Sequence, residues 1–268
     1  MKKFLFALAA VLFFLASATA QAAPPSYGSG EREQTEKETQ LEQIRQTVQA
    51  LQPLTDETAA RIAGHNVKVR NYSDADSMGL IYVSEGSGVV MAVDGNMAYI
   101  VSAAHCLRRA HTVVQFADGA EYEAFLAYLN PEKDVGFLLV PCAQLAPETR
   151  AAILPAAGAD AAQIGKKQGE PLCIVNSVLS PNGQVVGGVL DSFSVVYPNN
   201  PNQRVLQFLS TVSYGSSGGG VYSQEGVWVG IVSGGDTYGV CWAVPYGDIL
   251  SEFQAWLAGL AQQAAVAA

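Results

Sequence analysis

Three serines and four glycines lie close together in residues 211–220 (TVSYGSSGGG). A tight turn of this composition can expose a nucleophilic hydroxyl and direct backbone N–H groups toward one point. The turn would lie between a turn-rich run, residues 198–202, and an apolar strand-like run, residues 227–233. The stretch is also typical of a glycine-rich surface loop, so other residues must decide between the two interpretations.

A serine hydroxyl becomes a good nucleophile when a base takes its proton, and the chain has three histidines. His65 precedes the expected strands and is expected to be solvated, whereas His111 follows Arg-Arg-Ala as at a surface turn. His105 comes directly after the apolar run 98–104, behind two alanines that leave an imidazole room in a cleft. A satisfied core histidine is the alternative interpretation of such a residue. His105 is therefore the candidate base.

An acid must hold that imidazole in the useful tautomer. Asp94 and Asp118 are explained by Asp-Gly turns. Asp134 begins the apolar strand-like run 135–140, where a half-buried carboxylate needs a partner. A helix cap is the alternative role, but no helix is expected after Asp134. Asp134 is therefore the candidate orienting acid.

Short β-like runs separated by turn signals must position these residues. The first predicted strands are residues 79–84, 89–93, 98–102, 112–116, 121–128 and 135–140. After an alanine-rich connector the second set is 171–178, 184–196, 205–211, 221–222, 227–233 and 240–244. Two sets of about six strands without long helices between them predict an all-β protein with two sandwiches or barrels. An amphipathic helix over 249–260 closes the chain.

Residues 1–20 have the pattern of a secretory signal peptide, with cleavage after residue 20 or 22. Two lysines precede an apolar run of 13 residues, and small residues follow it. A membrane-spanning helix needs about 20 apolar residues. We therefore expect an exported protein, periplasmic or secreted, without membrane contact after cleavage.

Residues 21–65 are expected to be a linker and an amphipathic helical segment. Over 31–52 the residues Leu41, Ile44, Val48 and Leu51 form one apolar stripe, and a second short helix is predicted over 55–63. Packing on the main domain, a removable pro-segment and an oligomerisation arm remain open as roles. The main domain spans 66–268, with one half over about 66–143 and the other over about 168–247.

The charge of the chain excludes some classes of partner. Removing two lysines with residues 1–20 leaves 13 basic and 24 acidic residues, a net charge of −11. This charge repels nucleic acids and anionic membranes. The chain has no CxxC pair, so we expect no metal site, and no cofactor is expected. Bridges Cys106–Cys142 and Cys173–Cys241, or four free thiols, are the open alternatives.

Four motifs resemble, in family order, the landmarks of trypsin-like serine peptidases. They are residues 101–106 (VSAAHC), 134–139 (DVGFLL), 215–219 (GSSGG) and 230–235 (GIVSGG). The short spacing from His105 to Asp134 and the run 116–122 look most like the bacterial HtrA-type branch. The resemblance covers about residues 79–260 and implies two six-stranded antiparallel β-barrels with the active cleft between them.

The resemblance also implies roles for individual residues. Ser217 is similar to the nucleophile, His105 to the general base and Asp134 to the orienting acid. The N–H groups of Gly215 and Ser217 would form the oxyanion hole. Ser233 matches a serine that hydrogen-bonds the buried aspartate. The implied activity is that of a serine-type endopeptidase acting on proteins or peptides.

Substrate contacts follow from the same resemblance. Ser233, Gly234 and Gly235 match the strand along which a peptide lies as an added β-strand. Thr211 would lie at the base of the primary specificity pocket, where cleavage after Lys or Arg needs an aspartate. A neutral pocket favours small or aliphatic uncharged residues, and Asp236 is the alternative source of a basic preference.

The sequence departs from the family at several points. Ser216 occupies the place of the aspartate that pairs with a newly cut N-terminus in trypsin-type zymogens, so that activation is not expected. HtrA proteins carry a PDZ domain after the protease, and none is expected before the sequence ends at Ala268. A catalytically silent peptide-binding or chaperone-like module is the alternative function. A latent enzyme whose cleft is covered by residues 31–63 is a third possibility.

Overall fold

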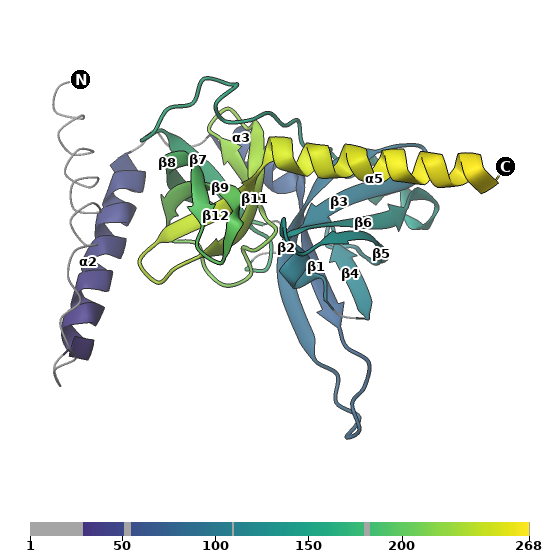
Figure 1. Cartoon of the computed structure of the whole chain (residues 1–268), viewed down its shortest axis with the longest axis horizontal. Coiled ribbons are helices and arrows are strands. Elements are labelled where there is room, and N and C mark those ends of the chain that lie inside the picture. Colours follow the sequence, from purple (N-terminus) through teal and green to yellow (C-terminus); the bar gives the residue numbers. More distant parts are fainter. Residues whose placement is uncertain (1–28, 51–54, 109, 180–182, 268) are drawn as a thin grey trace.

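Two closed six-stranded antiparallel barrels form the body of the protein, which confirms the predicted all-β fold (Figure 1). The computed structural model describes residues 29–50, 55–108, 110–179 and 183–267. The predicted signal peptide and the start of the linker lie outside these residues.

Barrel one is formed by the strands before residue 142. They are β1 (Asn66–Tyr72), β2 (Val83–Val93), β3 (Met97–Ser102), β4 (His111–Gln115), β5 (Glu121–Asn130) and β6 (Val135–Pro141). The order around the barrel is β1-β2-β3-β6-β5-β4, with β4 pairing back to β1. Barrel one contains its own core, which includes Val69, Ile100 and Leu138.

Barrel two repeats the topology of barrel one. Its strands are β7 (Pro171–Asn176), β8 (Gln184–Tyr197), β9 (Asn200–Ser210), β10 (Gly220–Ser223), β11 (Trp228–Gly235) and β12 (Val240–Pro245). The order β7-β8-β9-β12-β11-β10 closes through pairing of β10 with β7. The same connection pattern therefore occurs twice in the chain.

Three strand predictions were wrong in detail. β1 was not predicted, because Lys68 and Arg70 interrupt its apolar residues and bind the carboxylate of Glu85 on β2. The strands expected over 79–84 and 89–93 are replaced by the single strand β2. β9 begins at Asn200, within the run that was expected to be a turn.

A second core joins the two barrels to the C-terminal helix α5 (Tyr246–Ala267), which is longer than the predicted 249–260. Figure 1 shows α5 beginning at barrel two and extending across barrel one. The ring of Phe137 on β6 lies 5.2 Å from that of Phe253 and 5.7 Å from that of Trp256. Burial of these rings fixes barrel one against the helix that follows barrel two.

The predicted N-terminal helices are present as α2 (Ser29–Ala50) and α3 (Asp56–Gly64). The Thr55 hydroxyl caps α3 by accepting the N–H of Thr58. α2 packs on β8 and β9, and Ile44 of its apolar stripe is only 2% exposed. Short helical turns are η1 (Ala104–Cys106), η2 (Cys142–Gln144) and α4 (Pro147–Ala152).

The expectation of a solvated His65 was wrong. The residue ends α3, is 7% exposed and stacks on the ring of Tyr222. Its Nδ1 lies 2.8 Å from the carbonyl oxygen of Leu154. α3 packs on β1 and β8, which encloses the histidine that follows it.

Candidate active site

His105 lies on the single turn η1, directly after β3 has ended. β3 pairs with β6 so that Ser102 lies opposite Gly136. The end of β3 therefore lies beside the start of β6, which follows Asp134. The His105 side chain is 39% exposed, so one edge of the imidazole is accessible to solvent.

Asp134 gathers hydrogen bonds from both barrels. Its carboxylate accepts the His105 backbone N–H at 3.0 Å and lies 3.0 Å from the imidazole Nδ1 through each oxygen. The hydroxyl of Ser233, on β11 of barrel two, donates to Oδ2 at 2.5 Å. Because an ionised carboxylate only accepts, Nδ1 carries a proton, and in the neutral imidazole Nε2 keeps its lone pair.

The backbone of Asp134 is also unusual. Its φ is 54°, the only positive φ outside glycine in the described ranges, and the residue is only 8% exposed. A left-handed residue is tolerated best when it is Asn or Asp, and such strain is often found at functional sites. The tight turn before β6 thus aims the carboxylate inward toward His105.

The pKa of His105 is raised above its ordinary value. The hydrogen bond to Asp134 is the largest cause, the neighbouring Cys106 thiol adds to it, and burial opposes it. A raised pKa means that the imidazolium is stabilised once it has taken a proton.

Ser217 lies in the turn between β9 and β10 and is half-buried. Its carbonyl oxygen accepts the N–H of Ser87 on β2 at 2.8 Å, and the next N–H, of Gly218, donates to Val232 at 2.8 Å. Within the described residues its hydroxyl makes no hydrogen bond to His105 or to another side chain. Catalytic hydrogen bonds often shorten only when substrate binds.

Two N–H groups of this turn are available for a ligand. Those of Gly215 and Ser217 donate to no other residue in the described part of the chain, whereas those of Ser216, Gly218 and Gly219 are all bonded. Gly215 has a φ of 92°, which favours glycine at this position. Unpaired N–H groups beside a nucleophile can stabilise an oxyanion.

Two buried residues that the sequence did not reveal hold this turn. The amide of Asn176 donates to the Ser216 hydroxyl at 3.0 Å and to the Tyr214 carbonyl oxygen at 3.2 Å. The hydroxyl of Ser87 donates to the carbonyl oxygen of Gly215 at 2.8 Å. The sequence could have indicated them as polar residues in strand-like runs, since Asn176 ends the apolar strand β7 and Ser87 lies within β2.

Ser216 points away from solvent. It is 2% exposed, and its hydroxyl accepts from Asn176 rather than facing a substrate. The neutral side chains of Asn176 and Ser216 are thus paired at the place where trypsin-type zymogens would have an aspartate for an ion pair. The turn that bears Ser217 is held by hydrogen bonds between neutral groups.

Of the residues expected to contact substrate, Ser233, Gly234 and Gly235 form the end of β11. Ser233 is buried, Gly234 is half-buried and Gly235 is exposed, while Thr211 follows β9 and is half-buried. Gly235 pairs with Cys241 of β12. The carboxylate of Asp236 accepts the N–H groups of Tyr238 and Val240, so it is engaged within its own turn.

All four cysteines are free, which is the second of the two alternatives for them. Cys142, Cys173 and Cys241 are buried, and burial raises the pKa of the Cys241 thiol to about 12. Over the described ranges no group of three or more His, Cys, Asp or Glu side chains could hold a metal ion. In the same ranges no helix has both the length and the apolar character needed to cross a bilayer.

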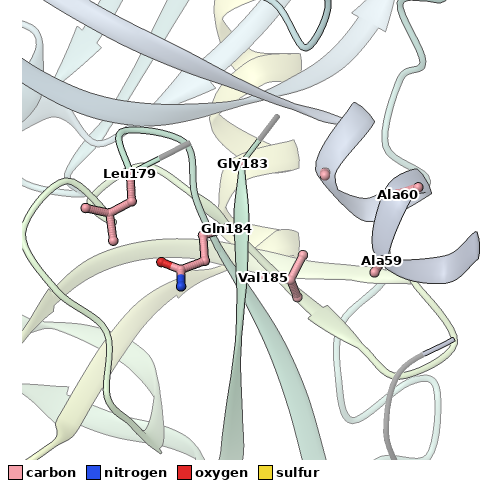
Figure 2. Close-up of a pocket in the computed structure, with 7 residues that line it drawn as sticks. Ala59, Ala60, Leu179, Gly183, Gln184 and Val185 are labelled. Carbon is pink, nitrogen blue, oxygen red and sulfur yellow. The ribbon is translucent and has the colours of Figure 1, made fainter. Parts of the chain in front are cut away.

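A separate hollow of about 540 Å³ lies between α3 and the start of β8 (Figure 2). It is lined by Ala59, Ala60, Ala63, Leu179, Gly183, Gln184 and Val185. None of the candidate catalytic residues borders it, and it contains no titratable side chain. We assign it no catalytic role.

Comparison with known proteins agrees with this geometry. The family model described as Trypsin-like peptidase domain matches residues 86–231. Serine protease HTRA2, mitochondrial, of Bos taurus is 27% identical over 175 residues, which cover 64% of this chain and 36% of the relative. Serine protease HTRA1B of Danio rerio is 26% identical over 180 residues, covering 65% and 35%. The chain thus spans about a third of the length of these relatives.

Solved structures show the same fold. HtrA-type protease AlgW with a tripeptide has a TM-score of 0.60 and 20% identity, with 74% of this chain and 61% of that chain covered. A substituted form of AlgW with a decapeptide has a TM-score of 0.62 and 17% identity, covering 75% and 66%. At these identities the likeness concerns the fold.

Proposed function

Because the chain belongs to the family of trypsin-like peptidases, we propose that it is a serine endopeptidase that hydrolyses peptide bonds through an acyl-enzyme. The observation that carries this proposal is the Asp134 carboxylate, which joins His105 of barrel one to Ser233 of barrel two. A purely structural carboxylate would not need an imidazole whose side chain is 39% exposed to solvent.

In the proposed first step the Ser217 hydroxyl oxygen attacks the scissile carbonyl carbon while His105 Nε2 takes its proton. The carbonyl oxygen becomes an oxyanion, which accepts the N–H groups of Gly215 and Ser217. The C–N bond then breaks, and the proton on Nε2 passes to the leaving amine. Asp134 stays ionised throughout and stabilises the imidazolium, in agreement with the raised pKa of His105.

In the second step water replaces the amine. His105 removes a proton from the water, whose oxygen attacks the acyl-enzyme ester. The tetrahedral intermediate collapses with return of the proton to Ser217 and release of the new carboxylic acid. Hydrolysis requires no metal or cofactor in this sequence of steps.

We propose that the substrate is a peptide segment with a small or aliphatic uncharged residue before the cut. Thr211 contributes no charge to the proposed pocket, and the Asp236 carboxylate is occupied by two N–H groups of its own turn. The peptide would add as a strand beside residues 233–235. The AlgW structures contain a tripeptide and a decapeptide, which supports a peptide substrate for this chain.

We also propose that the protein is exported, on the basis of the signal-peptide pattern in residues 1–20. Export would place the enzyme in the periplasm or outside the cell. N-terminal sequencing of the secreted or periplasmic fraction tests this, with a new N-terminus at residue 21 or 23 expected.

The silent peptide-binding module remains the second candidate, because the Ser217 hydroxyl makes no hydrogen bond to His105 within the described residues. A fluorophosphonate probe separates the two functions, since it reacts only with an activated serine. We expect covalent labelling at Ser217, located by peptide mass spectrometry and abolished in Ser217→Ala. No labelling of the folded, processed protein would favour the silent module.

A further inference from the structure

The turn that carries Asp134 is short and conformationally demanding. Residues 131–134 join β5 to β6, and the φ of 54° places Asp134 in the left-handed region. A residue other than glycine keeps such a conformation only when its surroundings fix it. The position of the carboxylate therefore depends on the contacts that hold the backbone of this turn.

Part of the support comes from the end of β5 in barrel one. The side-chain oxygen of Asn130 accepts the N–H groups of Glu132 at 3.1 Å and of Lys133 at 3.2 Å. The amide of Asn130 in turn donates to the carboxylate of Glu252 on α5 at 2.9 Å. These contacts fix N–H groups of the turn, and the carbonyl oxygens of Glu132 and Lys133 bind other partners.

Both of these carbonyl oxygens accept hydrogen bonds from barrel two. The side-chain amide of Gln203 donates to the carbonyl oxygen of Lys133 at 2.8 Å. The side-chain amide of Asn200 donates to the carbonyl oxygen of Glu132 at 2.7 Å. The two donors lie at the start of β9, 70 and 68 residues along the chain from their acceptors.

The hydrogen bond from Gln203 acts on the peptide unit that precedes Asp134. The carbonyl group of Lys133 and the N–H group of Asp134 belong to the same planar unit. A donor that fixes the orientation of this plane also restrains the φ of Asp134, because φ is the rotation between that plane and the Cα atom. Gln203 therefore holds the backbone torsion that directs the carboxylate.

An irregularity in β9 explains how Gln203 reaches the turn. Between the cross-strand pairs Val196–Arg204 and Tyr197–Asn200, three residues of β9 lie opposite none of β8. Bulges of this kind change the direction of side chains and are common beside active sites. Gln203 is the last of the three and is 3% exposed, whereas the other two are exposed. A buried amide needs a hydrogen-bond partner, which the turn of barrel one supplies.

We propose that Gln203 is a positioning residue for catalysis, which holds Asp134 in the orientation that binds His105. This inference rests on the proposed endopeptidase function and adds a residue of barrel two to the support of the acid. Gln203 acts through the backbone of Asp134 and does not itself touch the reacting atoms. Asn200 has a smaller part, because the carbonyl group that it binds is one residue further from Asp134.

The experiment replaces Gln203 by methionine in the full processed chain, which keeps the length of the side chain and removes the donor. The kcat for a peptide nitroanilide should fall about tenfold with little change in KM, because a slightly displaced acid orients His105 less well. A weaker bond to Asp134 lowers the pKa of His105, so the rise of kcat/KM with pH should begin at lower pH. The Cys106 thiol, which also raises this pKa, is the same in the variant and the wild type.

Gln207→Met is the matched control, because Gln207 lies on the same strand and its amide binds Asp191 and Trp242. It also loses an amide donor but does not touch the turn, so its pH dependence should equal that of the wild type. Asn200→Ala, at a half-buried residue, should change kcat in the same direction as Gln203→Met, by about threefold.

A double variant separates positioning from structural support. In the Asp134→Asn background, Gln203→Met should cause no further loss of kcat, because the acid that it holds is already replaced. A full further loss would overturn the proposal, as would a lowered Tm with unchanged kcat and pH dependence in Gln203→Met. If Gln203→Met does not fold, unchanged kcat and pH dependence in Asn200→Ala would overturn it.

An NMR titration of the His105 ring makes the test independent of turnover. The signals are assigned by their loss in His105→Gln, and the pKa that they report should be lower in Gln203→Met than in the wild type. An unchanged pKa would overturn the positioning role. Failure of the wild type to react with a fluorophosphonate at Ser217 would instead overturn the endopeptidase function.

Discussion

Barrel one and barrel two have the same strand order but hold their parts of the site in different ways. In barrel one, the pairing of β3 with β6 brings His105 beside Asp134, and a charged carboxylate joins them. In barrel two, the turn that bears Ser217 leaves the strands and is held by neutral hydrogen bonds. Two of these come from Ser87, which belongs to barrel one.

This difference indicates that the two barrels have different roles in the proposed mechanism. In barrel one, the hydrogen bond from His105 to Asp134 raises the pKa of the imidazole and so controls its protonation. The turn in barrel two presents the nucleophile and the unpaired N–H groups, so its conformation matters more than its charge. Substitutions in the two barrels should therefore have distinguishable kinetic signatures.

The largest effect is expected at the nucleophile in barrel two. Ser217→Ala should lower kcat about 10⁶-fold, because no other hydroxyl can form the acyl-enzyme. Hydrolysis of a peptide nitroanilide measures the loss. Ser216→Ala is the adjacent control and should lose about tenfold at most, since its hydroxyl is buried against Asn176. Equal losses in the two variants would contradict the assignment of Ser217.

The next largest effect is expected at the acid in barrel one. Asp134→Asn should lower kcat about 10⁴-fold by stabilising the wrong tautomer of His105. Catalysis requires neutral His105, so kcat/KM of the wild type should rise with pH along a limb set by its raised pKa. Because Asp134 is the main cause of that shift, the limb should move to lower pH in the variant. An unchanged pH dependence of kcat/KM in Asp134→Asn would contradict the proposed interaction between Asp134 and His105.

The pH dependence of the unfolding free energy provides a second test of the interaction between His105 and Asp134. The folded pKa of His105 lies above the unfolded value of 6.5, so its stabilising contribution is fully present below that value. The contribution is lost as the pH rises through the folded pKa. Chemical denaturation from pH 6 upward should therefore show a smaller loss of unfolding free energy in Asp134→Asn than in the wild type.

A smaller effect is expected when the turn of barrel two loses its support. Asn176→Ala removes the donor that binds Ser216 and Tyr214, and should lower kcat about a hundredfold with little change in KM. The pH limb should stay in place, unlike that of Asp134→Asn. Asn202→Ala, at an exposed asparagine, is the control and should behave like the wild type. A shift in the pH dependence of Asn176→Ala would contradict the proposal that the turn bearing Ser217 does not control the protonation of His105.

The smallest kinetic effect is expected at the link between the barrels. Ser233→Ala removes one of the hydrogen bonds to the Asp134 carboxylate, and His105 keeps the others. The loss in kcat should be about tenfold, as for one hydrogen bond to a charged group. Ser233→Thr, which retains a hydroxyl, provides the comparison. A loss as large as that of Asp134→Asn would mean that Ser233 has a more direct role.

Much of the fold could be predicted because its signals are local. Apolar runs identified most strands, the stripe containing Ile44 identified α2, and Asp-Gly turns separated neighbouring strands. β1 was missed because its charged residues obscure the pattern. These residues are accommodated through Glu85 on β2 and Glu121 on β5.

The sequence by itself determined the candidates His105, Asp134 and Ser217, since each lies in a short motif whose residue types indicate chemistry. Only the tertiary structure decided which residues support them. Ser87 and Gly215 are 128 residues apart in the chain, and Gln203 and Lys133 are 70 residues apart. The sequence does not reveal which residues are partners in such contacts, because distant residues meet only when whole elements pack together.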